Sequence, residues 1–233
     1  MSNTTLNIVA IAIFSIVMAS LLGPLIQLSP AVPAIAAAAM LCLFTADIFA
    51  WGGRMGNLIV DGFAQFSAEH RDRIVHHEAG HFLVAHVLGI SVTGYTLNAW
   101  DSFRQGQPGR GGVRFDDQPL QAALQTNQLP VQFLDRYCTV WMAGAAAERL
   151  IYGDVQGGAD DQDNFRILWA QLRRPTNEGD IKLRWSALRA RTLLETHRPA
   201  YDALVAAMGQ GASVEDCRQI LDAAIDENEA IAA

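Results

Sequence analysis

The sequence predicts a mostly α-helical protein, with an N-terminal transmembrane helical hairpin followed by a helical domain that holds a small β element. Three observations lead to this fold class. Two long apolar runs, 6–26 and 31–51, open the chain, and the first charged side chain is Asp47. Apolar residues then recur in steps of three and four along 67–88, as they do on one face of a helix. Residues 91–99 are rich in β-branched and aromatic side chains, which favours a strand.

Each apolar run is long enough to cross a hydrocarbon core of roughly 30 Å as a helix. Only QLSP, residues 27–30, separates the runs, so the two helices would be antiparallel. A cleaved signal peptide is one alternative, but the start, MSNTTLN, lacks the basic side chains of a signal sequence. A single span followed by a buried helix is the other alternative, because alanine-rich segments insert weakly. We predict a membrane hairpin over 1–53 and a linker over 54–66.

The charges around the hairpin predict its orientation. The turn carries no charge, whereas Arg54, Arg71 and Arg73 follow the second run. The positive-inside rule therefore places both ends, and the domain that follows, on the cytoplasmic or stromal side of the membrane. Three scattered cysteines outside any CxxC pattern agree with a reducing compartment. The net charge of −7 argues against a nucleic-acid partner.

The elements after the linker can be placed in order. A helix is expected over 67–88, with Ser67 as its cap and Gly89 at its end. The strand at 91–99 is followed by a glycine-rich loop and a short returning strand at 112–115. Apolar periodicity predicts six further helices, at 119–128, 130–152, 160–174, 180–196, 199–208 and 214–231.

Residues 77–81 read HEAGH and carry the chemically active side chains of the helix expected over 67–88. His77 and His81 are four residues apart, so both imidazoles project from one helix face and can bind one ion. A hydrolytic Zn²⁺ takes three protein ligands and leaves the fourth position to water, whose pKa it lowers to about 7. Glu78 would accept the proton of that water and deliver it to the leaving amine. The alternative is a core helix that happens to carry histidines, and we interpret His76 and His86 in that structural sense.

Three stretches resemble one known family. HHEAGHFLVAHVLG, residues 76–89, resembles the zinc-site helix of FtsH-type membrane proteases. MAGAAAERLIYGDV, residues 142–155, and GGADDQDNF, residues 157–165, are similar to the family's next helix and to its glycine-led segment with an aspartate ligand. The resemblance covers roughly residues 67–230. It implies a zinc peptidase domain over 67–233, with Zn²⁺ as its cofactor.

The resemblance also implies the roles of single residues. His77 and His81 would be zinc ligands, Glu78 the catalytic base, and an aspartate near 161 the third ligand. An alignment without a gap places that aspartate on Gln162, a poor zinc ligand, and a shift of one residue places it on Asp161, which we predict as the third ligand.

Other acidic residues near Asp161 could be the third ligand instead. Asp160 and Asp163 are alternatives to Asp161, and the stretch could instead be an acidic helix start without a metal. Glu148 would orient a histidine, coordinate directly, or be a charge on the helix face.

Family members usually carry an ATPase module before the protease. A phosphate-binding loop needs a lysine, and the sequence has only Lys182. The chain therefore resembles the stand-alone FtsH-like proteins that lack the AAA+ ATPase. The resemblance implies unfolded or damaged protein substrates, a separate AAA+ ATPase or FtsH-type partner, and a homo- or hetero-oligomer.

These observations favour a membrane-anchored zinc endopeptidase that acts in the quality control of membrane proteins. An inactive FtsH-like scaffold or regulator of protease hetero-oligomers is the first alternative. An intramembrane zinc protease is a lesser one, because Glu69, Arg71, Asp72 and Arg73 would be costly in lipid directly before the histidines.

Overall fold

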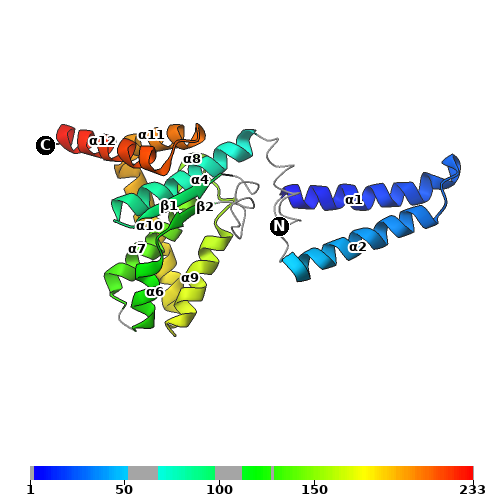
Figure 1. Ribbon diagram of the computed structural model, residues 1–233, viewed down its shortest axis with the longest axis horizontal. Helices are drawn as coiled ribbons and strands as arrows, with labels where there is room; N and C mark the ends of the chain where they lie inside the picture. Colours follow the sequence, from blue (N-terminus) through cyan, green and yellow to red (C-terminus); the bar gives the residue numbers. More distant parts are fainter. Residues whose placement is uncertain (1–2, 52–67, 98–111, 127–128, 233) are drawn as a thin grey trace. The chain divides into compact units, whose positions relative to one another are not determined.

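The computed structural model describes residues 3–51, 68–97, 112–126 and 129–232 (Figure 1). The chain divides into two compact units, of which one holds the N-terminal helices and the other holds 69–97 and 112–233. The predicted linker at 54–66, the proposed cap at Ser67 and the glycine-rich loop lie outside the described residues.

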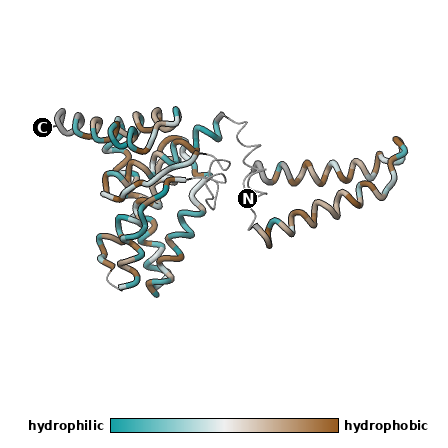
Figure 2. Tube along the Cα trace, in the orientation of Figure 1, coloured by the Kyte–Doolittle hydropathy of each residue, from teal (hydrophilic) through white to brown (hydrophobic). Residues whose placement is uncertain are grey.

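The N-terminal unit consists of two apolar helices, α1 (Asn3–Leu22) and α2 (Ala31–Trp51), joined by a short 3₁₀ helix, η1 (Gly23–Ile26). The amide of Leu28 donates to the carbonyl oxygen of Gly23 at 2.8 Å and closes the turn. Figure 2 shows apolar residues along both helices, whose large side chains are mostly exposed. Both helices are long and apolar enough to cross a bilayer, by length and composition.

The second unit contains the small β element beside the helix that carries HEAGH. That helix is α4 (Ala68–Val87), and Gly89 follows it with φ of 69°, in the left-handed region that ends many helices. Strands β1 (Val92–Thr96) and β2 (Gly112–Phe115) pair antiparallel, with an irregular register around Thr93. The expectation of a mostly helical chain with a small β element is confirmed.

Among its described residues, the second unit has seven further helices: α6 (Gln118–Gln125), α7 (Val131–Trp141), α8 (Ala143–Tyr152), α9 (Ala159–Gln171), α10 (Thr176–Thr196), α11 (Arg198–Gly209) and α12 (Val214–Ala232). Helix α10 contacts α7, α8, α9 and α11, while α12 contacts α11 and β1. Helix α10 begins four residues earlier than expected, directly after the extended Pro175.

The expectation of one continuous helix over 130–152 is wrong. Two helices, α7 and α8, meet at Met142. The carbonyl oxygen of Val140, close to this break, lies 2.7 Å from Nδ1 of His81. No local pattern marks the break, because apolar residues continue across it and no Gly or Pro stands at Met142.

Helices α4 and α8 approach each other closely at Gly80. A Cβ atom added there would lie 2.7 Å from Cβ of Ala147 and 2.8 Å from the carbonyl oxygen of Ala143. Both distances are far below van der Waals contact, and Ala143 and Ala147 are fully buried. The small residues of both helices therefore determine how near the histidines of α4 come to α8.

We expect Gly80→Ala to destabilise the protein by about 1–3 kcal/mol, because the added methyl group forces the two helices apart. The measurement is thermal unfolding of the full chain in detergent, followed by circular dichroism with a chelator present. Gly209→Ala is the matched control, because Gly209 is also helical and has no atom within 4 Å of an added Cβ. Equal melting temperatures for the two variants would show that the α4–α8 contact tolerates a methyl group.

Candidate metal centre

Helix α4 turns its three motif side chains toward the interior of the second unit. His77, Glu78 and His81 are 8%, 9% and 4% exposed. The rings of His77 and His81 lie edge to face, with centroids 4.8 Å apart. Burial of three ionisable groups on adjacent turns costs free energy unless each has a partner, so their surroundings indicate what the site binds.

Asp161 is the acidic residue that the structure brings to the two histidines. Its Oδ2 lies 3.3 Å from Nε2 of His77 and 3.4 Å from Nε2 of His81. Asp160 is exposed, and Asp163 forms a surface ion pair with Arg166. Among the residues that the structure describes, His77, His81 and Asp161 form a group that could hold a metal ion.

The other ring nitrogen of each histidine has an acceptor of its own. Nδ1 of His77 lies 2.7 Å from Oε1 of Glu148, and Nδ1 of His81 lies 2.7 Å from the carbonyl oxygen of Val140. A carbonyl or an ionised carboxylate only accepts, so both Nδ1 atoms carry a proton. In the neutral imidazoles the two Nε2 lone pairs then face Asp161, and three acceptors converge on one point.

The spacing of these three acceptors fits a tetrahedral metal site. Ligands bonded at about 2.0–2.1 Å around a tetrahedral centre are about 3.3 Å from one another. The two Nε2 atoms are 3.1 Å apart, and the distances to Oδ2 of Asp161 are 3.3 and 3.4 Å. The donor set and its spacing therefore suit a single cation held by two imidazoles and one carboxylate.

Glu148, on α8, fixes the orientation of His77. Its Oε1 also accepts from the amide of Gly157 at 3.0 Å, and its Oε2 accepts from the amide of Gln156 at 2.8 Å and from Arg73 at 3.2 Å. Burial opposes ionisation, but the hydrogen bonds from His77 and these donors lower the pKa of Glu148 to about 2. Glu148 is therefore a permanent anion behind His77 rather than part of the converging group.

Glu78 lies next to the histidines and is held by the β element. Its Oε2 accepts from the amide of Val113, on β2, at 2.9 Å. Burial raises the pKa of Glu78, against the opposing effect of His77 and His81. A carboxylate with a raised pKa is better suited to accept and return a proton near neutral pH.

The converging group itself attracts positive charge. Burial disfavours the charged imidazolium, but hydrogen bonds to Asp161 and Glu148 outweigh it and raise the pKa of His77 to about 10. Burial likewise disfavours the Asp161 anion, and the neighbouring His81 and His77 outweigh it and lower the pKa of Asp161. A metal ion at this position would displace protons from the imidazoles, as metal binding to histidine generally does.

Two glycines make room for these contacts. A Cβ at Gly144 would lie 2.3 Å from Nε2 of His77 and 2.5 Å from Nε2 of His81. A Cβ at Gly157 would lie 2.6 Å from Oε1 of Glu148. The backbone of α8 thus lies directly against the two Nε2 atoms, and the turn before α9 lies against the carboxylate of Glu148.

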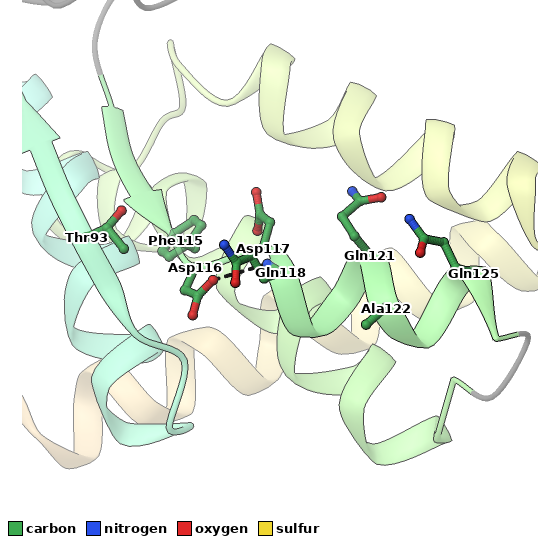
Figure 3. Close-up of a pocket in the computed structure, with 8 residues that line it drawn as sticks. All are labelled: Thr93, Phe115, Asp116, Asp117, Gln118, Gln121, Ala122 and Gln125. Atoms are coloured by element: carbon green, nitrogen blue, oxygen red, sulfur yellow. Dashed lines mark hydrogen bonds between the residues drawn. The ribbon is translucent and has the colours of Figure 1, made fainter.

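An open recess of about 500 Å³ lies beside β2 and α6, near the candidate centre (Figure 3). Phe115 connects the two, because it lines the recess and its ring centroid lies 6.4 Å from that of His81. The other lining residues come from β1, α6 and the turn between β2 and α6: Thr93, Asp116, Asp117, Gln118, Gln121, Ala122 and Gln125.

Two further histidines of α4, His76 and His86, have other partners. His76 lies 2.8 Å from the hydroxyl of Tyr201, and His86 pairs with Asp222 at 2.9 Å. These contacts join α4 to α11 and α12 and fit the structural interpretation of both residues.

Several contributors to the centre were not predicted from the sequence. Gly144 lies inside the small-residue run MAGAAAE, which is the signal that could have revealed it. Arg73 lies four residues before His77 on the same helix face, and this spacing in the sequence could have revealed it as well. The carbonyl of Val140 and the amide of Val113 are backbone groups and leave no mark in a pattern of side chains.

No protein-family model matches this sequence, and no curated protein matches it.

We expect Asp161→Ala to weaken metal binding by more than about tenfold. Removing a residue that only supports a metal ligand already weakens binding by about tenfold or more, and Asp161 would be a ligand itself. Bound metal per chain, measured by elemental analysis after dialysis, gives the result. Asp163→Ala is the matched control, because Asp163 is exposed on the same helix and pairs with Arg166. Equal metal content in the two variants would exclude Asp161 as a ligand.

We expect Gly144→Ala to abolish metal binding while the fold persists. The added methyl group would occupy space next to both Nε2 atoms, whereas alanine is favoured over glycine inside a helix by about 1 kcal/mol. Metal content and far-ultraviolet circular dichroism are measured together, with Gly209→Ala as the control for a helical glycine in open surroundings. Full metal content in Gly144→Ala would contradict the placement of the ion between the two histidines and α8.

Proposed function

We propose that this protein is a membrane-anchored zinc endopeptidase of the FtsH type. The observation that carries the proposal is the convergence of Nε2 of His77, Nε2 of His81 and Oδ2 of Asp161, with Glu78 adjacent on the same helix. The HEAGH motif and the two later stretches that resemble the family support the same assignment.

His77, His81 and Asp161 would hold the ion. Two nitrogens and one oxygen form a donor set that zinc accepts in hydrolytic enzymes, where one position is left for water. When bound there, Zn²⁺ would lower the pKa of water to about 7 and polarise the carbonyl of the peptide bond. Glu148 and Val140 support the centre by keeping the protons of both imidazoles on Nδ1.

Glu78 would move the proton. The amide of Val113 holds Oε2, and Oε1 has no hydrogen-bond partner among the residues that the structure describes. Oε1 is therefore the atom we assign to accept a proton from the attacking water and to deliver it to the leaving amine. The raised pKa of Glu78, caused by burial, makes its carboxylate a stronger base for the first of these two proton transfers.

The two apolar helices would anchor the enzyme. Their length and hydropathy suit a membrane hairpin, and the arginines that follow α2 favour the cytoplasmic or stromal side for the peptidase unit. Unfolded or damaged proteins are the proposed substrates, supplied alone or by a separate AAA+ ATPase. The recess at Phe115 is a place where a substrate side chain could lie next to the centre.

We expect Glu78→Gln to lower cleavage of an unfolded protein by about 10²–10⁴-fold, because general acid–base catalysis contributes this much. The assay uses the full chain in detergent, casein as substrate and no ATP, and zinc per chain is measured on the same sample. Zinc should stay near the wild-type content, because Glu78 is not one of the converging atoms.

Glu69→Gln is the matched control, because it removes the same charge from a glutamate in the first turn of α4. Wild-type protein that binds zinc but cleaves nothing would favour the inactive scaffold over the peptidase. Residual cleavage by Glu78→Gln equal to wild type would exclude Glu78 as the base.

A further inference from the structure

The outer face of α10 carries a stripe of exposed apolar side chains. Ile181, Trp185 and Leu188 follow one another at steps of four and three, so they share one helix face. They are 60%, 44% and 64% exposed. The other side of the helix packs into the core through Ala190 and Leu194, which are fully buried.

This stripe is unusual within the second unit. Among the described residues after α2, five large apolar side chains are strongly exposed, and three of them belong to the stripe. Scattered apolar side chains on a surface need no explanation, but a contiguous group commonly marks a contact with a partner or a membrane. We call Ile181, Trp185 and Leu188 the α10 stripe.

Basic side chains border the α10 stripe. Nζ of Lys182 lies 4.4 Å from the ring centroid of Trp185, and the guanidinium of Arg189 lies 5.4 Å from it. Lys182 is also paired with Asp135, and Arg191 with Glu195. Arg184 and Arg189 have no ion-pair partner within the described part of the chain, so their charges are available to an anion.

The charge of this region is opposite to that of the whole chain. Residues 163–195 contain seven basic and four acidic side chains, a net charge of +3, whereas the whole chain carries −7. A local excess of positive charge attracts a polyanionic surface even when the protein as a whole is acidic.

We propose that the α10 stripe docks the second unit on the surface of an anionic lipid bilayer. The chemistry fits the interface between water and hydrocarbon, where Trp, Ile and Leu insert shallowly while Arg and Lys contact anionic headgroups. An isologous contact with a second copy would instead bring the same arginines together and leave them repelling one another. The docking rests on the proposed insertion of α1 and α2, because that tether raises the effective concentration of the stripe at the bilayer; it does not depend on peptidase activity.

The test uses the full chain reconstituted into vesicles and measures how bromine atoms on lipid tails quench Trp185. One set of vesicles contains brominated phosphatidylcholine with plain phosphatidylcholine, and the other replaces the plain lipid by phosphatidylglycerol. The difference between wild type and Trp185→Phe isolates the signal of Trp185 from that of the other tryptophans. We expect Trp185 to be quenched in the anionic vesicles and much less in the zwitterionic ones.

Arg184→Glu should lower the ratio of docked to undocked protein by at least about fivefold, because one basic side chain near an anionic surface contributes about that factor. Arg149→Glu is the matched control, with the same charge change at an exposed position of α8. Vesicle flotation is measured in parallel and should be unchanged in both variants, because α1 and α2 hold the chain in the membrane.

The outcomes separate the docking from the proposed function. Loss of flotation in wild type would refute the membrane anchor itself. Normal flotation with equal quenching of Trp185 in both kinds of vesicle would refute the docking of the α10 stripe but leave the membrane anchor intact. Normal flotation together with an Arg184→Glu variant that only changes the oligomeric state would show that a second chain covers the α10 stripe, and would also overturn the proposal.

Discussion

The buried carboxylate of Glu148 is the contact on which the candidate centre depends. It comes from α8, yet it binds His77 and Arg73 on α4 and two backbone amides of the turn that leads to α9. One anion therefore joins the three segments that must meet. The same contact sets the tautomer of His77, because the proton held on Nδ1 leaves the Nε2 lone pair directed at Asp161. A shift of α8 would thus disturb the position of the turn and the electronic state of the imidazole together.

Small residues allow this arrangement to form. Hydrogen bonds from side chains to a neighbouring helix require that the two backbones lie close together, and Gly80 and Gly144 remove the atoms that would prevent it. Gly157 does the same for the turn before α9. The cost is conformational, since each glycine loses more backbone freedom on folding than alanine does. That cost is offset only if the resulting hydrogen bonds are strong, and here they involve charged groups in a buried site.

The sequence predicted the helices well, and predicted the candidate site in part. Periodicity located α4, and the spacing of His77 and His81 on one helix face followed from helix geometry alone. Asp161 could not be chosen over Asp160 or Asp163 from spacing, because the path of the turn before α9 determines which carboxylate returns to the histidines. The break at Met142 was invisible for a similar reason. Apolar residues suit the interior on both sides of it, and the position of the break depends on tertiary contacts that no local pattern records.

The charges around the candidate centre bear on which ion it could hold. Buried Glu78 and Glu148 and partly buried Asp161 can supply three negative charges, and buried Arg73 supplies one positive charge, which it shares with the exposed Asp154. Two further positive charges would leave the cluster neutral, and burial of a net charge is what the protein must avoid. Protons on both imidazoles provide those charges, which is why burial fails to lower the pKa of His77 and of His81. A divalent cation between the two Nε2 atoms and Oδ2 of Asp161 provides the same two charges and frees both imidazoles to remain neutral. The electrostatics of the cluster therefore favour a divalent ion at the point on which the three ligand atoms converge.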